Sequence, residues 1–134
     1  MKPTWRRLLA VLAGVITGGI VIFLMETIGH TVIPPPDHVD LSDIDSMNAY
    51  MQEAPVAVLL FVVLGWLLGC LMGGWVAARI FKESLLASFI CGTVLLVFSI
   101  INMTSFYHPV WVWIAALAGM VPAAWYGGRL GIRR

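Results

Sequence analysis

Four long apolar runs, separated by short charged or polar segments, constrain this chain more than any other feature. The first run, Leu8 to Met25, has about 18 residues without a charge, which is enough for a helix to cross a bilayer. The chain has 134 residues, of which 60% are hydrophobic and 11% are charged. A small water-soluble domain lacks the interior volume to bury that much apolar sequence. We therefore predict an all-α integral membrane four-helix bundle.

The runs form a single membrane domain over residues 1–134. An uncleaved anchor explains the first run better than a secretory signal peptide does. The apolar core of a signal peptide has only about 7–15 residues, and no small-residue cleavage site follows this run. The predicted spans cover about 7–30, 55–78, 84–104 and 109–130, and the one long polar segment covers 31–54.

The 31–54 segment is acidic and contains no Lys or Arg. It opens with three prolines, 34–36, which end the first helix because proline lacks an amide hydrogen and restricts the residue before it. Ser42 or Asp43 could cap a short helix after them. One face of that helix would carry Ile44, Met47, Tyr50 and Met51. Two interpretations stay open: an amphipathic helix lying on the membrane surface, or a solvated acidic loop.

Basic residues occur in only three segments: the N-terminus, the connection after the second span, and the C-terminus. They are Lys2, Arg6, Arg7, Arg79, Lys82, Arg129, Arg133 and Arg134. In a four-span chain these three segments share one side of the membrane. The positive-inside rule assigns that side to the cytoplasm. We therefore predict that both termini are cytoplasmic and that the 31–54 segment faces outward.

Small residues recur every four positions in the second and fourth spans, so each set forms one narrow face of its helix. Apolar side chains gain little by leaving lipid for each other, so close backbone approach along small residues holds membrane helices together. We therefore predict two faces that pack against other helices. Their residues are Gly65, Gly69 and Gly73 in the second span and Gly119, Ala123 and Gly127 in the fourth.

The end of the second span recurs at the end of the fourth. Residues 73–80 and 123–130, which are 50 positions apart, both read small-small-Trp-x-small-small-Arg-aliphatic. One interpretation is that the chain consists of two repeated helical hairpins, related by an axis along the membrane normal. The alternative is convergence, because Trp and Arg are common at the inner interface and small residues are common at helix contacts.

Four polar residues are predicted to meet near the outer end of the bundle: Glu26, His30, Asn102 and His108. Glu26 and His30 are four positions apart and share a helix face. Asn102 lies on the third span, taken here as antiparallel to the first. Glu26 and Asn102 are each about 18 residues, or about 27 Å, from the inner end of their spans. His108 follows in the next turn. Ionisable groups in membrane segments are candidate functional residues, because burying a charge in hydrocarbon is costly.

Three interpretations of this candidate polar site stay open: structural pairing of Glu26 with His30, handling of protons or ions, and a metal site for Zn²⁺ or a similar ion. No catalytic residue or cofactor is predicted, and we expect the protein not to be an enzyme. Cys70 and Cys91 fall inside spans, where thiols act as small packing groups. Redox chemistry would need an accessible, activated thiolate.

Several of these features together resemble small bacterial four-span inner-membrane proteins with no known activity. The features that carry this resemblance are the Glu26-x-x-x-His30 pattern before the prolines, the 73–79 run, and His108-Pro109. The resemblance implies four spans and a location in the bacterial inner (plasma) membrane, but it implies no activity.

Two function classes follow. The favoured one is an accessory or interaction protein that uses its small-residue faces for helix contacts. The alternative is a small oligomeric transporter or channel that handles protons or ions at the outer Glu/His site. The first is favoured because the second and fourth spans place no charge at mid-membrane. The expected partners are the lipid bilayer and either further copies, forming a homo-oligomer, or another membrane protein. Nucleic acid is not expected, because the basic residues are topology signals.

Overall fold

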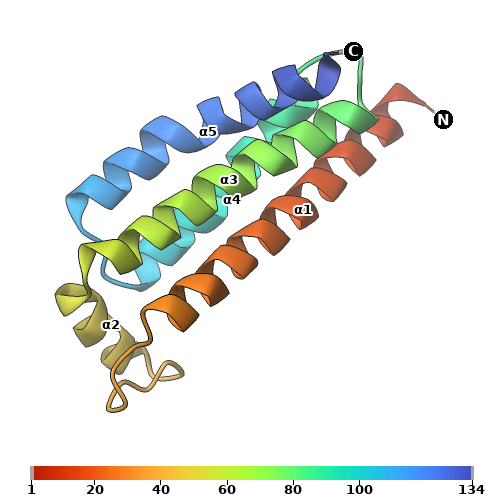
Figure 1. The fold of residues 1–134 in the computed structure, drawn as a ribbon. Helices are drawn as coiled ribbons and strands as arrows, with labels where there is room; N and C mark the ends of the chain where they lie inside the picture. Colours follow the sequence, from red (N-terminus) through yellow and green to blue (C-terminus); the bar gives the residue numbers. More distant parts are fainter. Residues whose placement is uncertain (1, 134) are drawn as a thin grey trace.

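The structure, a computed structural model, describes residues 2–133, which form five helices and no strand (Figure 1). The long helices are α1 (Pro3–Val32), α3 (Val56–Ile80), α4 (Leu86–Ser105) and α5 (Val110–Ile132), and the short helix α2 (Ile44–Glu53) lies between α1 and α3. Each long helix has the length and apolar composition to cross a membrane. The predicted all-α membrane four-helix bundle is therefore confirmed.

The two ends of the bundle differ in what they carry. The two termini and the α3–α4 connection lie at one end, called here the basic end (Figure 1). Helix α2 and the α4–α5 connection lie at the other, called the α2 end. Helices α1 and α4 both run from the basic end to the α2 end, so they are parallel. The expectation that they are antiparallel was wrong. The depths of Glu26 and Asn102 were both counted from the basic end, so the match between these two depths is unaffected.

Three helices continue past the predicted spans at the basic end. Helix α1 begins at Pro3, and α3 and α5 end at Ile80 and Ile132. Hydropathy marks only the apolar part of a helix, whereas the hydrogen-bonded backbone continues until a capping residue or a connection ends it. The interfacial Trp and Arg residues therefore belong to the helices themselves.

Helices α1 and α3 approach each other at glycines on both sides of the contact. A Cβ added to Gly73 would lie 2.6 Å from the carbonyl oxygen of Gly14, and one added to Gly69 would lie 2.8 Å from that of Gly18. Gly65 instead faces the side chain of Met25. Backbones this close gain dispersion and Cα–H···O contacts that any larger residue would prevent.

Helix α5 packs on a second face of α3. Gly74 lies against the backbone of Ala124, and Gly127 lies against the carbonyl of Leu71. Ala124 is fully buried, whereas the predicted Ala123 is only half-buried. Gly119 meets only a side chain, that of Leu67. The close α3–α5 approach is therefore concentrated near the basic end.

The arrangement of the helices lacks the two-fold symmetry expected of two repeated hairpins. In such a repeat α1 and α3 would correspond to α4 and α5, so a contact between α3 and α4 would require one between α5 and α1. Within residues 2–133, α3 contacts α4 but α1 does not contact α5. The two helix ends are alike only locally. Arg79 Cζ lies 5.7 Å from the Trp75 ring centroid, and Arg129 Cζ lies 5.0 Å from the Trp125 ring centroid. The arrangement favours convergence over duplication.

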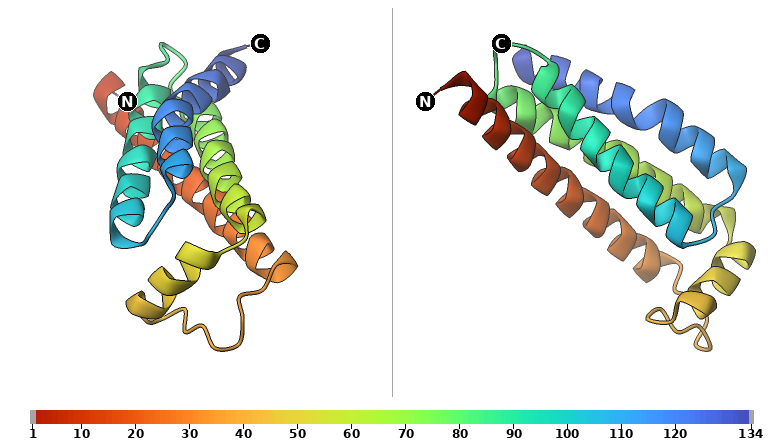
Figure 2. Two further views of the ribbon diagram at one scale, coloured as in Figure 1. Left: turned by 90° about the vertical axis from the view of Figure 1, so that its left-hand side faces the viewer. Right: turned by 180° about the vertical axis from the view of Figure 1, so that it is seen from behind.

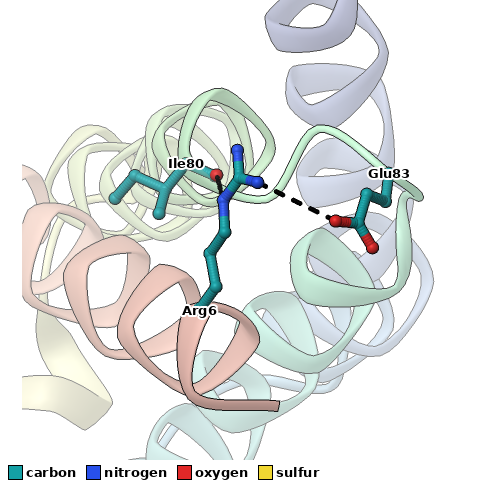
Figure 3. Close-up of polar contacts among 3 residues, drawn as sticks. All are labelled: Arg6, Ile80 and Glu83. Carbon is teal, nitrogen blue, oxygen red and sulfur yellow. Dashed lines mark hydrogen bonds and ion pairs between the residues drawn. The ribbon is translucent and has the colours of Figure 1, made fainter. Parts of the chain in front are cut away.

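Arg6 ties the start of α1 to the end of α3 (Figure 3). Its Nε–H donates to the carbonyl oxygen of Ile80 at 2.9 Å, and Nη1 lies 3.8 Å from Glu83 Oε1. The hydrogen bond satisfies one of the last α3 carbonyls, which have no partner inside the helix. The ion pair adds little, because both side chains are substantially exposed to solvent.

Candidate functional site

The four predicted polar residues line one cavity at the α2 end. Glu26 and His30 come from α1, Asn102 from α4 and His108 from the α4–α5 connection. The cavity has a volume of about 110 Å³, which is room for several waters or a small polar group. His38, in the 31–54 segment, does not line this cavity but a separate hollow beside Pro34 and Glu53. The geometry therefore brings together residues up to 82 positions apart, from Glu26 to His108.

Helix α2 forms the roof of this cavity. Asp43 caps it by accepting a hydrogen bond from the Ser46 amide at 3.2 Å, because an exposed first turn needs an acceptor for its free N–H groups. Met47, Tyr50 and Met51 line the cavity, and the last two are buried. The 31–54 segment therefore contains the amphipathic helix of the first interpretation, but most of its apolar face packs on protein rather than on the membrane surface.

One polar contact joins α2 to the rest of the bundle. The amide of Tyr107, in the α4–α5 connection, donates to Asn48 Oδ1 at 2.7 Å. Helix α2 and that connection therefore meet above the cavity. The sequence indicated which α2 residues share a face but carried no signal for what the face covers.

His108 is held in place from two directions. Its Nδ1–H donates to the Phe106 carbonyl oxygen at 2.9 Å, which leaves Nε2 as the acceptor. Its ring lies against Trp66, with ring centroids 5.8 Å apart. His108 is only 7% exposed. Burial lowers the pKa of His108, while the hydrogen bond to the Phe106 carbonyl opposes that shift. The imidazole is therefore neutral at pH 7.

We expect the protein to lose stability as the pH falls below about 6.5, the ordinary pKa of histidine. The folded state binds the His108 proton more weakly than the unfolded state does. Stability is therefore complete above the unfolded pKa and declines as the pH falls toward the folded one. Thermal midpoints in detergent at pH 7.5 and 5.5 measure this effect. His108→Asn keeps an N–H for the Phe106 carbonyl but cannot titrate, so an equal decline in that variant would assign the effect elsewhere.

A second hollow of about 180 Å³ adjoins the first and shares Glu26 and Asn102 with it. We call the first hollow the cavity and the second the slot. The slot lies between α1 and α4 and reaches toward the middle of the bundle. Its other lining residues are Gly19, Ile22, Trp66, Leu95, Phe98 and Ser99. Glu26 and Asn102 therefore stand at the junction between the cavity, which contains both imidazoles, and the slot, to which the other residues add mainly apolar side chains.

The polar groups at the site suit hydrogen bonding and the recognition of a cation. They comprise one carboxylate, one amide, two imidazoles and the Tyr50 phenol. No three His, Cys, Asp or Glu side chains in residues 2–133 are placed to share a metal ion. Cys70 and Cys91 are both buried, on α3 and α4.

Comparison with known proteins adds no assignment: no family model, curated protein or solved structure matches the chain. The cavity, the slot and the helix contacts are therefore the features that indicate a function.

Proposed function

We propose that this chain is a small accessory protein of the bacterial inner membrane that binds a ligand at the α2 end. The observation that carries the proposal is the single cavity lined by Glu26, His30, Asn102 and His108. These residues come from three parts of the chain, and a separate helix covers them. Keeping a carboxylate half-buried inside a membrane bundle has a free-energy cost that packing alone does not require, which supports a binding role.

Close contacts toward the basic end support binding rather than conduction. On the side of the slot toward the basic end, Gly18 lies against Leu95 and Gly69. One helical turn further toward the basic end, Gly14 lies against Cys91 and Gly73. The contacts between α1 and α3 are backbone to backbone, and the Leu95 and Cys91 side chains of α4 pack on the same two glycines of α1. This close packing argues against a passage between α1, α3 and α4. A transporter or channel would need a second path, formed between copies of the chain.

In this proposal the glycine stripe, defined as Gly65, Gly69 and Gly73, serves the fold rather than a partner. Its members face α1 of the same chain. The surface left for a partner or a second copy consists of lipid-facing aliphatic side chains, such as Ile16 and Ile20 on α1. The proposed working surface of the accessory protein is therefore the cavity.

We infer from the charge distribution that both termini are cytoplasmic and that the cavity opens on the opposite side. Basic residues gather at the basic end, whereas the acidic 31–54 segment lies at the α2 end. Fusions of a fluorescent protein and of alkaline phosphatase to each terminus test this orientation. We expect fluorescence and no phosphatase activity at both ends. Phosphatase activity at either end would rule out the orientation.

Native mass spectrometry of the protein, purified in mild detergent, tests the binding function. We expect a non-covalently retained mass on the wild-type chain that is lost in Glu26→Gln. The neutral amide keeps the size of Glu26 but loses its charge. Asp45→Asn is the matched control, because it removes a charge from exposed α2 surface outside the cavity. Equal thermal midpoints of the wild type and of both variants would show that the fold is intact. A chain that retains no mass, or retains it equally in Glu26→Gln, contradicts the proposal.

A further inference from the structure

The cavity and the slot lie side by side and differ in the side chains that each adds to the shared pair. They share Glu26 and Asn102, the cavity adds both imidazoles, and the slot adds mainly apolar side chains. Glu26 is 6 residues from the end of α1 at Val32, which is about 9 Å along the helix. Glu26 and the cavity therefore lie near the depth of the lipid headgroups, and the slot extends toward the acyl chains.

The slot opens sideways between α1 and α4. These helices touch near the middle of α1, where Gly14 lies close to the Cys91 side chain and Gly18 lies close to the Leu95 side chain. They separate toward the α2 end, as the left view of Figure 2 shows. Gly19 borders the slot and has no atom within 4 Å of its would-be Cβ. A chain-like molecule can therefore enter from the bilayer without the site having to open.

Charge at the junction favours a cationic headgroup. Glu26 is the one carboxylate among the residues that line the two hollows, and none of those residues is Lys or Arg. Phe61 and Phe106 add aromatic rings, which attract an ammonium group. An anionic headgroup would lie beside the Glu26 carboxylate, with no Lys or Arg in either hollow to balance the charge. Phosphate oxygens would still find N–H donors in the Asn102 side-chain amide.

Hydrogen bonding narrows the headgroup to a primary amine. A primary ammonium donates three N–H groups, and the Glu26 carboxylate and the Asn102 carbonyl are acceptors at the junction. A trimethylammonium group has no N–H to donate and would leave these acceptors unpaired. Charge-assisted hydrogen bonds are the strong ones, so this difference is large enough to select a lipid.

We propose that the site binds one phospholipid with a primary-amine headgroup, the headgroup lying in the cavity and one acyl chain in the slot. This inference rests on the proposed binding function and specifies its ligand. The Glu26 carboxylate holds the ammonium, with His108 Nε2 as a further acceptor in the cavity, the Asn102 amide N–H groups face the phosphate, and the space beside Gly19 takes the chain.

Lipid titration of the delipidated protein, followed by native mass spectrometry, tests the proposal. The probes are phosphatidylethanolamine, phosphatidylcholine, phosphatidylglycerol and glycerophosphoethanolamine, which is the headgroup without chains. We expect one phosphatidylethanolamine per chain, bound at least about tenfold tighter than each of the other three, the effect of one charge-assisted hydrogen bond or more. Glu26→Gln should remove the preference over phosphatidylcholine.

Gly19→Leu tests the slot, because Gly19 lines it and an added Cβ there would have no atom within 4 Å. An unchanged thermal midpoint would show that the fold is intact. We expect it to weaken phosphatidylethanolamine binding at least about tenfold, since filling the slot removes the apolar burial of several methylene groups. Ala118→Leu, a similar enlargement on the exposed surface of α5, should leave binding unchanged. Equal binding of all three lipids, or no effect of Gly19→Leu, overturns the inference. A retained mass that depends on Glu26 but is not a lipid also overturns it, and leaves the binding function standing.

Discussion

Replacing Gly73 by alanine will destabilise the bundle, whereas the same replacement at Gly19 will not. Alanine is favoured over glycine inside a helix by about 0.8–1.0 kcal/mol, so the local effect is stabilising at both positions. At Gly73 the new Cβ would lie 2.6 Å from the Gly14 carbonyl oxygen, which is backbone and cannot turn aside. Overpacking of this kind costs about 1–3 kcal/mol. Thermal midpoints of the two variants in the same detergent measure the difference.

Larger residues should widen this difference. Gly69→Leu and Gly73→Leu would force α1 and α3 apart, because a leucine side chain cannot fit between two touching backbones. Leu68→Ala is the control on the neighbouring, partly exposed face of α3. If the glycine variants are as stable as this control, the α1–α3 contact does not hold the helices together.

Met51→Ala is expected to release α2 while leaving the four long helices folded. Met51 is 6% exposed and lines the cavity, and truncating a buried methionine costs about 2–5 kcal/mol. Apart from that burial, α2 is held by Tyr50 and by the bond between Asn48 and the Tyr107 amide. The loss should therefore appear as local opening rather than as global unfolding.

Hydrogen exchange distinguishes these outcomes for Met51→Ala. We expect faster exchange of the α2 amides and of the Tyr107 amide, with unchanged protection in α3 and α5. Gln52→Ala, one position along on the exposed face of α2, should exchange like the wild type. Unchanged protection of α2, or a uniform loss across all five helices, would show that α2 is not a separately docked roof.

The spans and the depth of the polar residues could be predicted from the sequence because both follow from one-dimensional rules. Lipid requires long apolar helices, and a fixed rise per residue places Glu26 and Asn102 at one level. The expected helix faces were less exact. A four-residue spacing overshoots the helical repeat of 3.6, so the fourth-span face turns as it proceeds. Gly127 therefore meets the backbone of Leu71 while Gly119 meets a side chain, and Ala124 rather than Ala123 is fully buried.

The rest of the candidate site depends on tertiary structure that no local pattern encodes. The spacing of Met47, Tyr50 and Met51 indicated a shared face, but not that the face covers His108. The slot exists because α1 and α4 diverge past Gly18, a tertiary feature to which both helices contribute. Gly19, next to Gly18, carried no separate signal, because a glycine facing open space and a glycine facing a helix look alike in the sequence.

The contacts between α1 and α3 also bear on how the chain is assembled during synthesis. The glycine contacts and the Arg6–Ile80 hydrogen bond join parts of the chain that are complete once Glu83 has been made. Helix α5 is the least apolar of the four and inserts last. By then the Gly74 face of α3 is already in the bilayer. The first half of the protein thus provides a docking surface inside the membrane for a helix that lipid alone would accept least readily.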